Sequence, residues 1–245
     1  MRETPLLDLI YPRRCPMCQE IVPAGIDGWN GNNLLICSGC RERLPYLQPP
    51  YCLKCGKEVE REDQEYCYDC SRQLRHYRKG YPVLHYRGEC RKGMEAFKYH
   101  NRREYAQFYG EIIAERHGRE LTELKLDGIV PVPIHRHKKR KRGYNQAELI
   151  ARELGIRIHV SCYPDCLIRT ADTTPQKELN DVQRLENLKN AFLFRENHVE
   201  LKKVLLVDDI YTTGATIEAC TLALLAGGVA EVYYTSVCIG SNLST

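Results

Sequence analysis

The clearest hydrophobic pattern of the chain lies near its end. Four consecutive apolar residues, Val204–Val207, predict a strand buried on both faces, as in a parallel sheet. From Ala215 the apolar positions recur with helical spacing, and this helix is expected to end at Gly227–Gly228, where a left-handed cap fits. Alternating apolar positions over Ala230–Ile239 predict a further strand. The pattern therefore predicts a strand, a tight turn, a helix and a second strand.

The preceding part of the chain repeats this alternation. Its apolar patterns predict strands at Tyr81–Tyr86 and Gly128–Val132, helices over Glu89–His100 and Glu104–Arg119, and a helix opened by Gly143–Gln146 that runs to Leu154. Strands that alternate with helices are typical of a doubly wound parallel sheet. We therefore expect an α/β domain over residues 80–245, with a core of its own.

Polar residues of an unusual kind follow the Val204–Val207 strand. Two carboxylates, Asp208 and Asp209, come first, and a short turn then leads into the predicted helix through Thr212, Thr213, Gly214, Ala215 and Thr216. Such a helix N-terminus, with small residues and hydroxyls, can hold a phosphate, and the carboxylates can accept hydrogen bonds from vicinal hydroxyls or hold a metal. Together they predict a site for a 5-phosphoribosyl group.

A basic segment follows the predicted Gly128–Val132 strand. Six of the eight residues from His135 to Arg142 are Lys or Arg. A loop after a parallel strand faces the ligand crevice of a doubly wound sheet. We therefore expect a basic loop, with Arg140, Lys141 and Arg142, that binds pyrophosphate or nucleic-acid phosphates; a solvated run of charge is the alternative.

The stretch Arg169–Phe192 starts as a loop around Pro175 and continues as a polar helix. It is expected to form a hood over the crevice. Gln176, Arg184 and Asn187 lie off its apolar stripe, where they face either a ligand or solvent.

Composition narrows the class of protein only a little. The chain has 245 residues, 43% hydrophobic and 28% charged, which is ordinary for a globular protein, and its net charge of +4 is mild. The N-terminus does not resemble a secretory signal, and Glu218 and Glu231 interrupt the best candidate for a membrane span. We therefore expect a cytoplasmic protein without a transmembrane segment.

Cysteine spacing sets residues 1–75 apart as a small domain. Eight of the thirteen cysteines form C-x-x-C pairs: Cys15 and Cys18, Cys37 and Cys40, Cys52 and Cys55, Cys67 and Cys70. In a reducing compartment this spacing predicts two structural zinc sites rather than disulfides or redox pairs. Sequential pairing is favoured because each half then closes locally, while cross-braced pairing stays open. A charged segment, Ser71–Lys79, is expected to link the two domains.

These motifs, in this order, resemble the ComF family. The resemblance rests on the zinc-type cysteines, the RGYNQ segment at Arg142–Gln146, the hood motif T-P-Q…L…R…N…AF and the terminal DDIYTTGAT at Asp208–Thr216. It covers nearly the whole chain. It implies a double zinc ribbon followed by a type I phosphoribosyltransferase-like fold, and a role in DNA uptake and natural transformation.

The resemblance also implies roles for the residues of the loop. Asp208 and Asp209 would bind the ribose hydroxyls of phosphoribosyl pyrophosphate (PRPP), residues 212–216 its 5-phosphate with Mg²⁺ present, and Arg142 the pyrophosphate side. Three functions stay open: a phosphoribosyltransferase with an unidentified acceptor, a PRPP sensor without turnover, and a binder of single-stranded DNA. Tyr46, Tyr51, Tyr66 and Tyr68 of the ribbons either stack on DNA bases or fill the ribbon interior.

Overall fold

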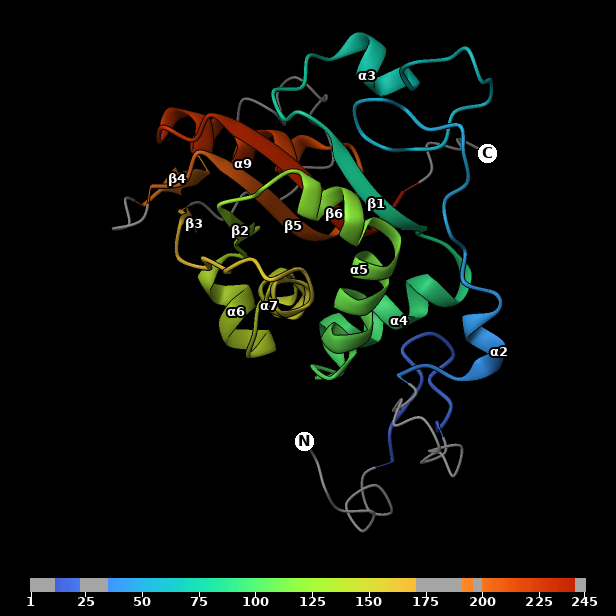
Figure 1. Cartoon of the computed structure of the whole chain (residues 1–245). Helices are drawn as coiled ribbons and strands as arrows, with labels where there is room; N and C mark the ends of the chain where they lie inside the picture. Colours follow the sequence, from blue (N-terminus) through green and yellow to red (C-terminus); the bar gives the residue numbers. More distant parts are fainter. Residues whose placement is uncertain (1–11, 23–34, 171–190, 196–199, 241–245) are drawn as a thin grey trace, which may run out of the picture.

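The protein is described by a computed structural model that covers residues 12–22, 35–170, 191–195 and 200–240. At its centre lies a parallel sheet with the strand order β1-β6-β5-β2 (Figure 1). These strands are β1 (Gly80–His85), β6 (Glu231–Ile239), β5 (Lys203–Tyr211) and β2 (Gly128–Pro131). The sequence-based prediction of an α/β fold with a parallel sheet is confirmed, and the arrangement is compatible with a type I phosphoribosyltransferase fold.

Strand β5 is buried on both faces because its side chains alternate between two hydrophobic cores. Leu205 and Val207 belong to the core that also contains residues of α4 (Gly88–Tyr99), α5 (Tyr105–Glu123) and α7 (Gln146–Ile158). Val204 and Leu206 belong to the second core, with α9 (Ala215–Ala226). Helices therefore cover both faces, which explains the continuous apolar run.

Three further features belong to the α/β part. A small antiparallel pair, β3 (Leu167–Arg169) and β4 (Phe192–Phe194), adjoins α9. Helices α5 and α7 pack closely because Gly110 has no side chain, and a Cβ atom there would lie 2.6 Å from the Glu153 Cβ. The helix after β5 ends as predicted, with Gly228 at φ 94°.

The basic segment is a helix, and the expectation of a loop is wrong. Helix α6 spans Arg136–Arg142. The His135 Nδ1 atom accepts a hydrogen bond from the His137 backbone N–H at 3.3 Å, and Gly143 ends the helix at φ 80°. Lys and Arg have good helix propensity, and positive charge in the last turn interacts favourably with the helix dipole.

The two cysteine-rich segments lie on different sides of the α/β part (Figure 1). The first, with α2 (Ser38–Arg41), shares a core with α4 and α5; the second, with α3 (Tyr68–Arg72), packs at the start of β1, where the Gly80 N–H donates to the Lys54 carbonyl at 2.8 Å. The expectation that residues 80–245 have a separate core is therefore wrong, because cysteines of both segments contribute to the two cores.

Candidate functional site

Strand β5 carries the two predicted carboxylates, Asp208 and Asp209, near its C-terminal end, just before the threonine-rich turn. The Asp208 Oδ1 atom accepts a hydrogen bond from the Asp209 N–H at 2.8 Å. Gly214 then adopts φ 78°, and α9 begins at the next residue. A helix of this length, entered through small residues and hydroxyls, provides N–H groups and a positive dipole end for an anion. The structure thus has the strand, turn and helix that the phosphate site requires.

Lys98 joins this site, although the sequence pattern did not point to it. Its Nζ atom lies 2.8 Å from Asp209 Oδ2, and the two side chains are only 19% and 14% exposed. Burial lowers the pKa of Lys98, but attraction to the Asp209 carboxylate outweighs this, so the pKa lies above its ordinary value. Asp209 is therefore held as one half of a partly buried ion pair.

Asp208 has a different environment. Burial, and next the neighbouring Asp209 carboxylate, raise its pKa to about 8. Near neutral pH this carboxyl group therefore keeps its proton unless a cation or a strong donor draws it into the ionised form. The pair offers carboxylate oxygens, which suit Mg²⁺, beside hydrogen-bond acceptors for a diol.

Helix α4 connects the carboxylates to the basic helix. Consecutive residues near its end make the two contacts: Lys98 pairs with Asp209, while the Tyr99 ring lies 5.1 Å from the Arg142 guanidinium. Arg142 Nη1 also donates to Gln146 Oε1 at 3.1 Å. Arg142 is thus linked to the carboxylate end of β5 through adjacent residues of one helix, whereas the Arg140 and Lys141 side chains are exposed.

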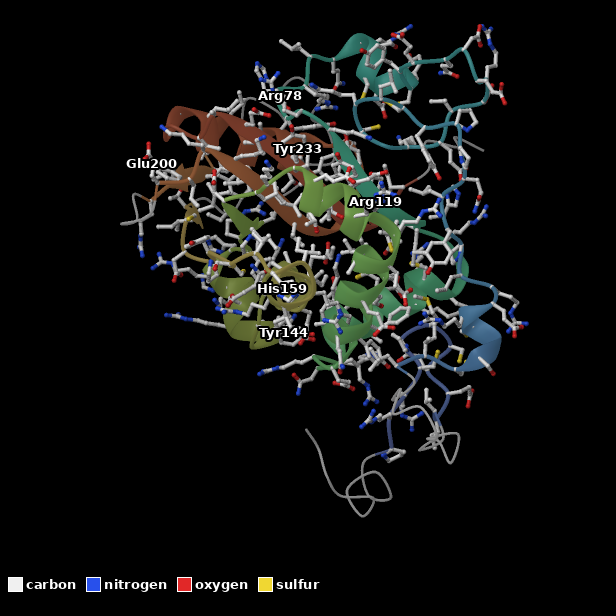
Figure 2. All side chains as sticks on the ribbon, in the orientation of Figure 1. Arg78, Arg119, Tyr144, His159, Glu200 and Tyr233 are labelled. Carbon is white, nitrogen blue, oxygen red and sulfur yellow. The ribbon has the colours of Figure 1, made fainter. Side chains whose placement is uncertain are left out.

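The Tyr144–Gln146 part of the RGYNQ segment is structural. Tyr144, labelled in Figure 2, lies between α6 and α7 in the sequence, and its buried hydroxyl donates to the Phe97 carbonyl of α4. Asn145 caps α7 by accepting from the Ala147 N–H at 3.2 Å, and its Nδ2 atom donates to the Val132 carbonyl at 3.0 Å. These bonds fix the start of α7 against α4 and the end of β2.

The eight ribbon cysteines form two groups of four. In each group the sulfur atoms lie within 4.8 Å of one another: Cys15, Cys18, Cys37 and Cys40, and Cys52, Cys55, Cys67 and Cys70. A tetrahedral zinc with Zn–S bonds of about 2.3 Å places its sulfurs about 3.8 Å apart. The Cys18–Cys37 and Cys55–Cys67 sulfurs are 3.8 and 3.6 Å apart. The residues therefore fit two structural zinc sites with sequential pairing, as favoured from the spacing.

Comparison with known proteins identifies the cysteine-rich part and the relatives of the chain as a whole. A family described as "Double zinc ribbon domain" matches residues 6–71. The chain is 31% identical to Competence protein F of Haemophilus influenzae over 202 residues, which cover 80% of this chain and 87% of that protein. The chain belongs to the ComF family.

Two other relatives of this ComF-family chain cover similar lengths. DNA utilization protein YhgH of Escherichia coli is 28% identical over 94% of this chain and 98% of its own length. Competence protein ComFC of Bacillus subtilis is 26% identical over 80% of each chain. The relationship therefore extends through both the cysteine-rich and the α/β parts.

The tyrosines of the ribbons fall into two classes in this ComF protein. Tyr51 donates its hydroxyl to the Leu47 carbonyl at 3.0 Å, and Arg116 lies 5.8 Å from the Tyr46 ring, so both rings have packing roles. Tyr66 and Tyr68 are 44% and 64% exposed, and the Arg72 guanidinium lies over the Tyr68 ring, 4.3 Å from its centroid.

The predicted hood, with Gln176, Arg184 and Asn187, lies outside the described residues, which include only its ends at β3 and β4. Within the residues that are described, no helix is long and apolar enough to cross a membrane.

Proposed function

We propose that this ComF protein binds PRPP with Mg²⁺ at Asp208, Asp209 and residues 212–216. The observation that carries the proposal is the carboxylate pair at the end of β5, directly before a threonine-rich turn into a helix N-terminus. The carboxylates would accept hydrogen bonds from the ribose hydroxyls, the turn would bind the 5-phosphate, and Arg142 would face the pyrophosphate. Mg²⁺ would offset the charge of the ligand.

Lys98 refines this assignment. An unpaired carboxylate pair would repel a ligand that carries about five negative charges. The Lys98 ammonium offsets the charge of Asp209, whose carboxylate would still accept a hydrogen bond from a hydroxyl. The site is therefore less repulsive than the sequence DDIYTTGAT suggests.

Calorimetric titration of PRPP, with and without Mg²⁺, tests the proposal. Asp208→Asn combined with Asp209→Asn should weaken binding roughly 10- to 1000-fold if the carboxylates bind the diol or the metal. If they merely lie near the phosphate, removal of negative charge leaves affinity equal or raises it. Asp127→Asn is the control, because Asp127 accepts from the Lys202 and Lys203 N–H groups at the opposite end of β5.

Binding alone leaves two chemical outcomes. A transferase would position an acceptor and stabilise departing pyrophosphate, which requires no nucleophile from the protein. A sensor would bind PRPP without turnover. Pyrophosphate release in a screen of acceptor bases distinguishes the two.

The relatives are named for competence and for DNA utilization, and one surface of this protein supports a proposed role in DNA uptake through contact with single-stranded DNA. Lys138, Lys139, Arg140 and Lys141 are exposed on α6, and the adjacent Tyr99 ring is 65% exposed beside Arg142. Positive charge can bind the phosphates of single-stranded DNA, and an exposed aromatic ring beside it can stack on the bases. We propose that incoming single-stranded DNA lies along this surface, where other proteins of the uptake machinery would deliver it.

Alanine at all four α6 positions should weaken binding of an oligothymidine and lower its salt slope by about 2–3, since each phosphate contact contributes about 0.7. Tyr99→Ala should weaken binding with the slope retained, because stacking releases no counterions. Arg119→Ala is the control, because Arg119 is an exposed arginine of α5, outside α6 (Figure 2). An unchanged slope in the α6 variant would exclude this surface.

A further inference from the structure

The segment that connects the second ribbon to the sheet contacts the proposed phosphate turn directly. We call Arg75–His76–Tyr77 the arm; it follows Cys70, a member of the second cysteine group, and precedes β1. Sequence alone predicts a charged linker here. In the structure the Arg75 and Tyr77 side chains are only 4% and 0% exposed. A linker with two large buried side chains has a role in packing.

Arg75 holds the backbone of the turn. Its Nη2 atom donates to the Thr213 carbonyl oxygen at 2.7 Å and to Gln73 Oε1 at 2.6 Å. A trans peptide is planar, and its C=O and N–H bonds point in opposite directions. By fixing the Thr213 carbonyl, Arg75 therefore also fixes the direction of the Gly214 N–H, one of the donors expected to meet a phosphate.

Glu218 ties the same arm to the first turn of α9. Its side chain is 1% exposed and accepts hydrogen bonds from the His76 backbone N–H at 3.0 and 3.2 Å; it also contacts His76 Nδ1. The Glu218 N–H in turn donates to the Gly214 carbonyl at 2.9 Å. The arm is thus hydrogen-bonded to the turn through Arg75 and to the start of α9 through His76.

Three tyrosines in mutual contact extend this support to the cysteine group. The Tyr77 hydroxyl lies 3.0 Å from the Tyr211 hydroxyl, and the Tyr211 ring stacks on Tyr234 with centroids 4.9 Å apart. The Tyr234 hydroxyl donates to the Cys55 carbonyl at 2.7 Å. Tyr211 also lies directly under the turn, because a Cβ atom on Gly214 would come within 2.2 Å of its hydroxyl.

We propose that Arg75 and Glu218 are positioning residues for the 212–216 turn, and that they couple the second zinc site to ligand binding. The coupling follows because the arm comes directly after the second cysteine group, the Tyr234 hydroxyl contacts Cys55 of that group, and the arm and Tyr211 both contact the turn. The first cysteine group belongs instead to the core that contains residues of α4 and α5. The ligand part rests on the proposed PRPP site, whereas the positioning of the turn does not.

Hydrogen exchange of the zinc-loaded full chain without ligand tests the positioning alone. Arg75→Ala should raise exchange of amides in the 212–218 segment about tenfold or more. Glu218→Gln keeps the size but loses the charge, and should give a smaller rise in the same segment. Arg78→Ala is the matched control, because the Arg78 side chain is exposed and its ion pair is long, with 3.8 Å between Arg78 Nε and Glu231 Oε2. Exchange in Arg75→Ala equal to that of the wild type and of this control would overturn the proposal.

Calorimetry and competition for zinc then test the coupling. Arg75→Ala should bind PRPP about 10- to 100-fold more weakly while it keeps its zinc. By linkage, saturating PRPP should raise the equilibrium affinity for one zinc ion, measured by competition with a chromogenic chelator, in the wild type but not in the variant. An equal rise in affinity in both proteins would refute the coupling. Absence of PRPP binding by the wild type would remove the proposed function and leave the exchange result to decide on positioning.

Discussion

Replacement of Asp208 by Asn should make the protein progressively more stable than the wild type as the pH rises from 6 to 8. Burial and the Asp209 carboxylate raise the pKa of Asp208 from 3.8 to about 8 in the folded protein. Between these values the folded protein keeps a proton that the unfolded chain has already lost. The unfolding free energy of the wild type therefore falls with rising pH, and Asn removes this contribution because it does not titrate.

The size of the effect follows from the two pKa values. Each pH unit between them costs about 1.4 kcal/mol, and the slope halves where pH equals the folded pKa, so the full shift gives about 2 kcal/mol between pH 6 and 8. Asp208 is half-buried, and water screens part of its interaction with Asp209. We therefore expect the stability difference to grow by about 1–2 kcal/mol over this interval.

Urea unfolding of the zinc-saturated proteins at pH 6, 7 and 8 measures this difference, with Asp127→Asn to correct for the change in net charge. A difference that stays constant across the three pH values would refute the reasoning. The same titration has a ligand counterpart. If ionised Asp208 binds the diol, the ratio of wild-type to variant PRPP affinity should rise with pH. The ratio is used because the ionisation of PRPP itself affects both proteins equally.

Two other predictions concern the ion pair and the zinc. Lys98→Met should destabilise the protein by about 2–3 kcal/mol in urea unfolding, because it leaves Asp209 without its counter-charge beside Asp208. Lys98→Arg should restore most of this stability, and equal stability of the wild type and both variants would contradict a stabilising ion pair. Cys52→Ser should lose one zinc by metal analysis and lower the melting temperature of the whole chain, since Cys52 belongs to the same core as Val204 and Leu206. Cys162→Ser, outside both cysteine groups, should keep its zinc.

The parts of the fold that sequence predicted are those encoded by nearby residues. Val204–Val207 must lie in a doubly covered strand because each residue is apolar, and Gly228 must end a helix because it takes a left-handed conformation at little cost. The cysteine pairs are equally local, since a C-x-x-C turn can present two sulfurs by itself. Short-range pattern was therefore enough for strands, helices and metal ligands.

Electrostatic partners were not predictable in this way. Lys98 is one of several charged residues near the end of α4, and its Asp209 partner follows more than a hundred residues later. The basic segment was predicted wrongly for a related reason. A run of Lys and Arg suggests a ligand loop, yet both residue types have good helix propensity, and His135 caps the helix that they form. Charge patterns show where charge is, whereas the fold decides what it meets.

The arm shows how far this distinction reaches. Ser71–Lys79 has the composition of a solvated linker, and most of its side chains are exposed as that composition predicts. Arg75 differs because its Nη2 atom donates to the Thr213 carbonyl, whereas its Nε atom is buried and has no hydrogen-bond partner among the described residues. A binding site built from residues 208–216 would thus depend on a residue that no motif contains. Such residues can be recognised only from a structure in which the linker packs against the turn. Through them, the zinc ribbon and the phosphate site of a ComF protein would be coupled.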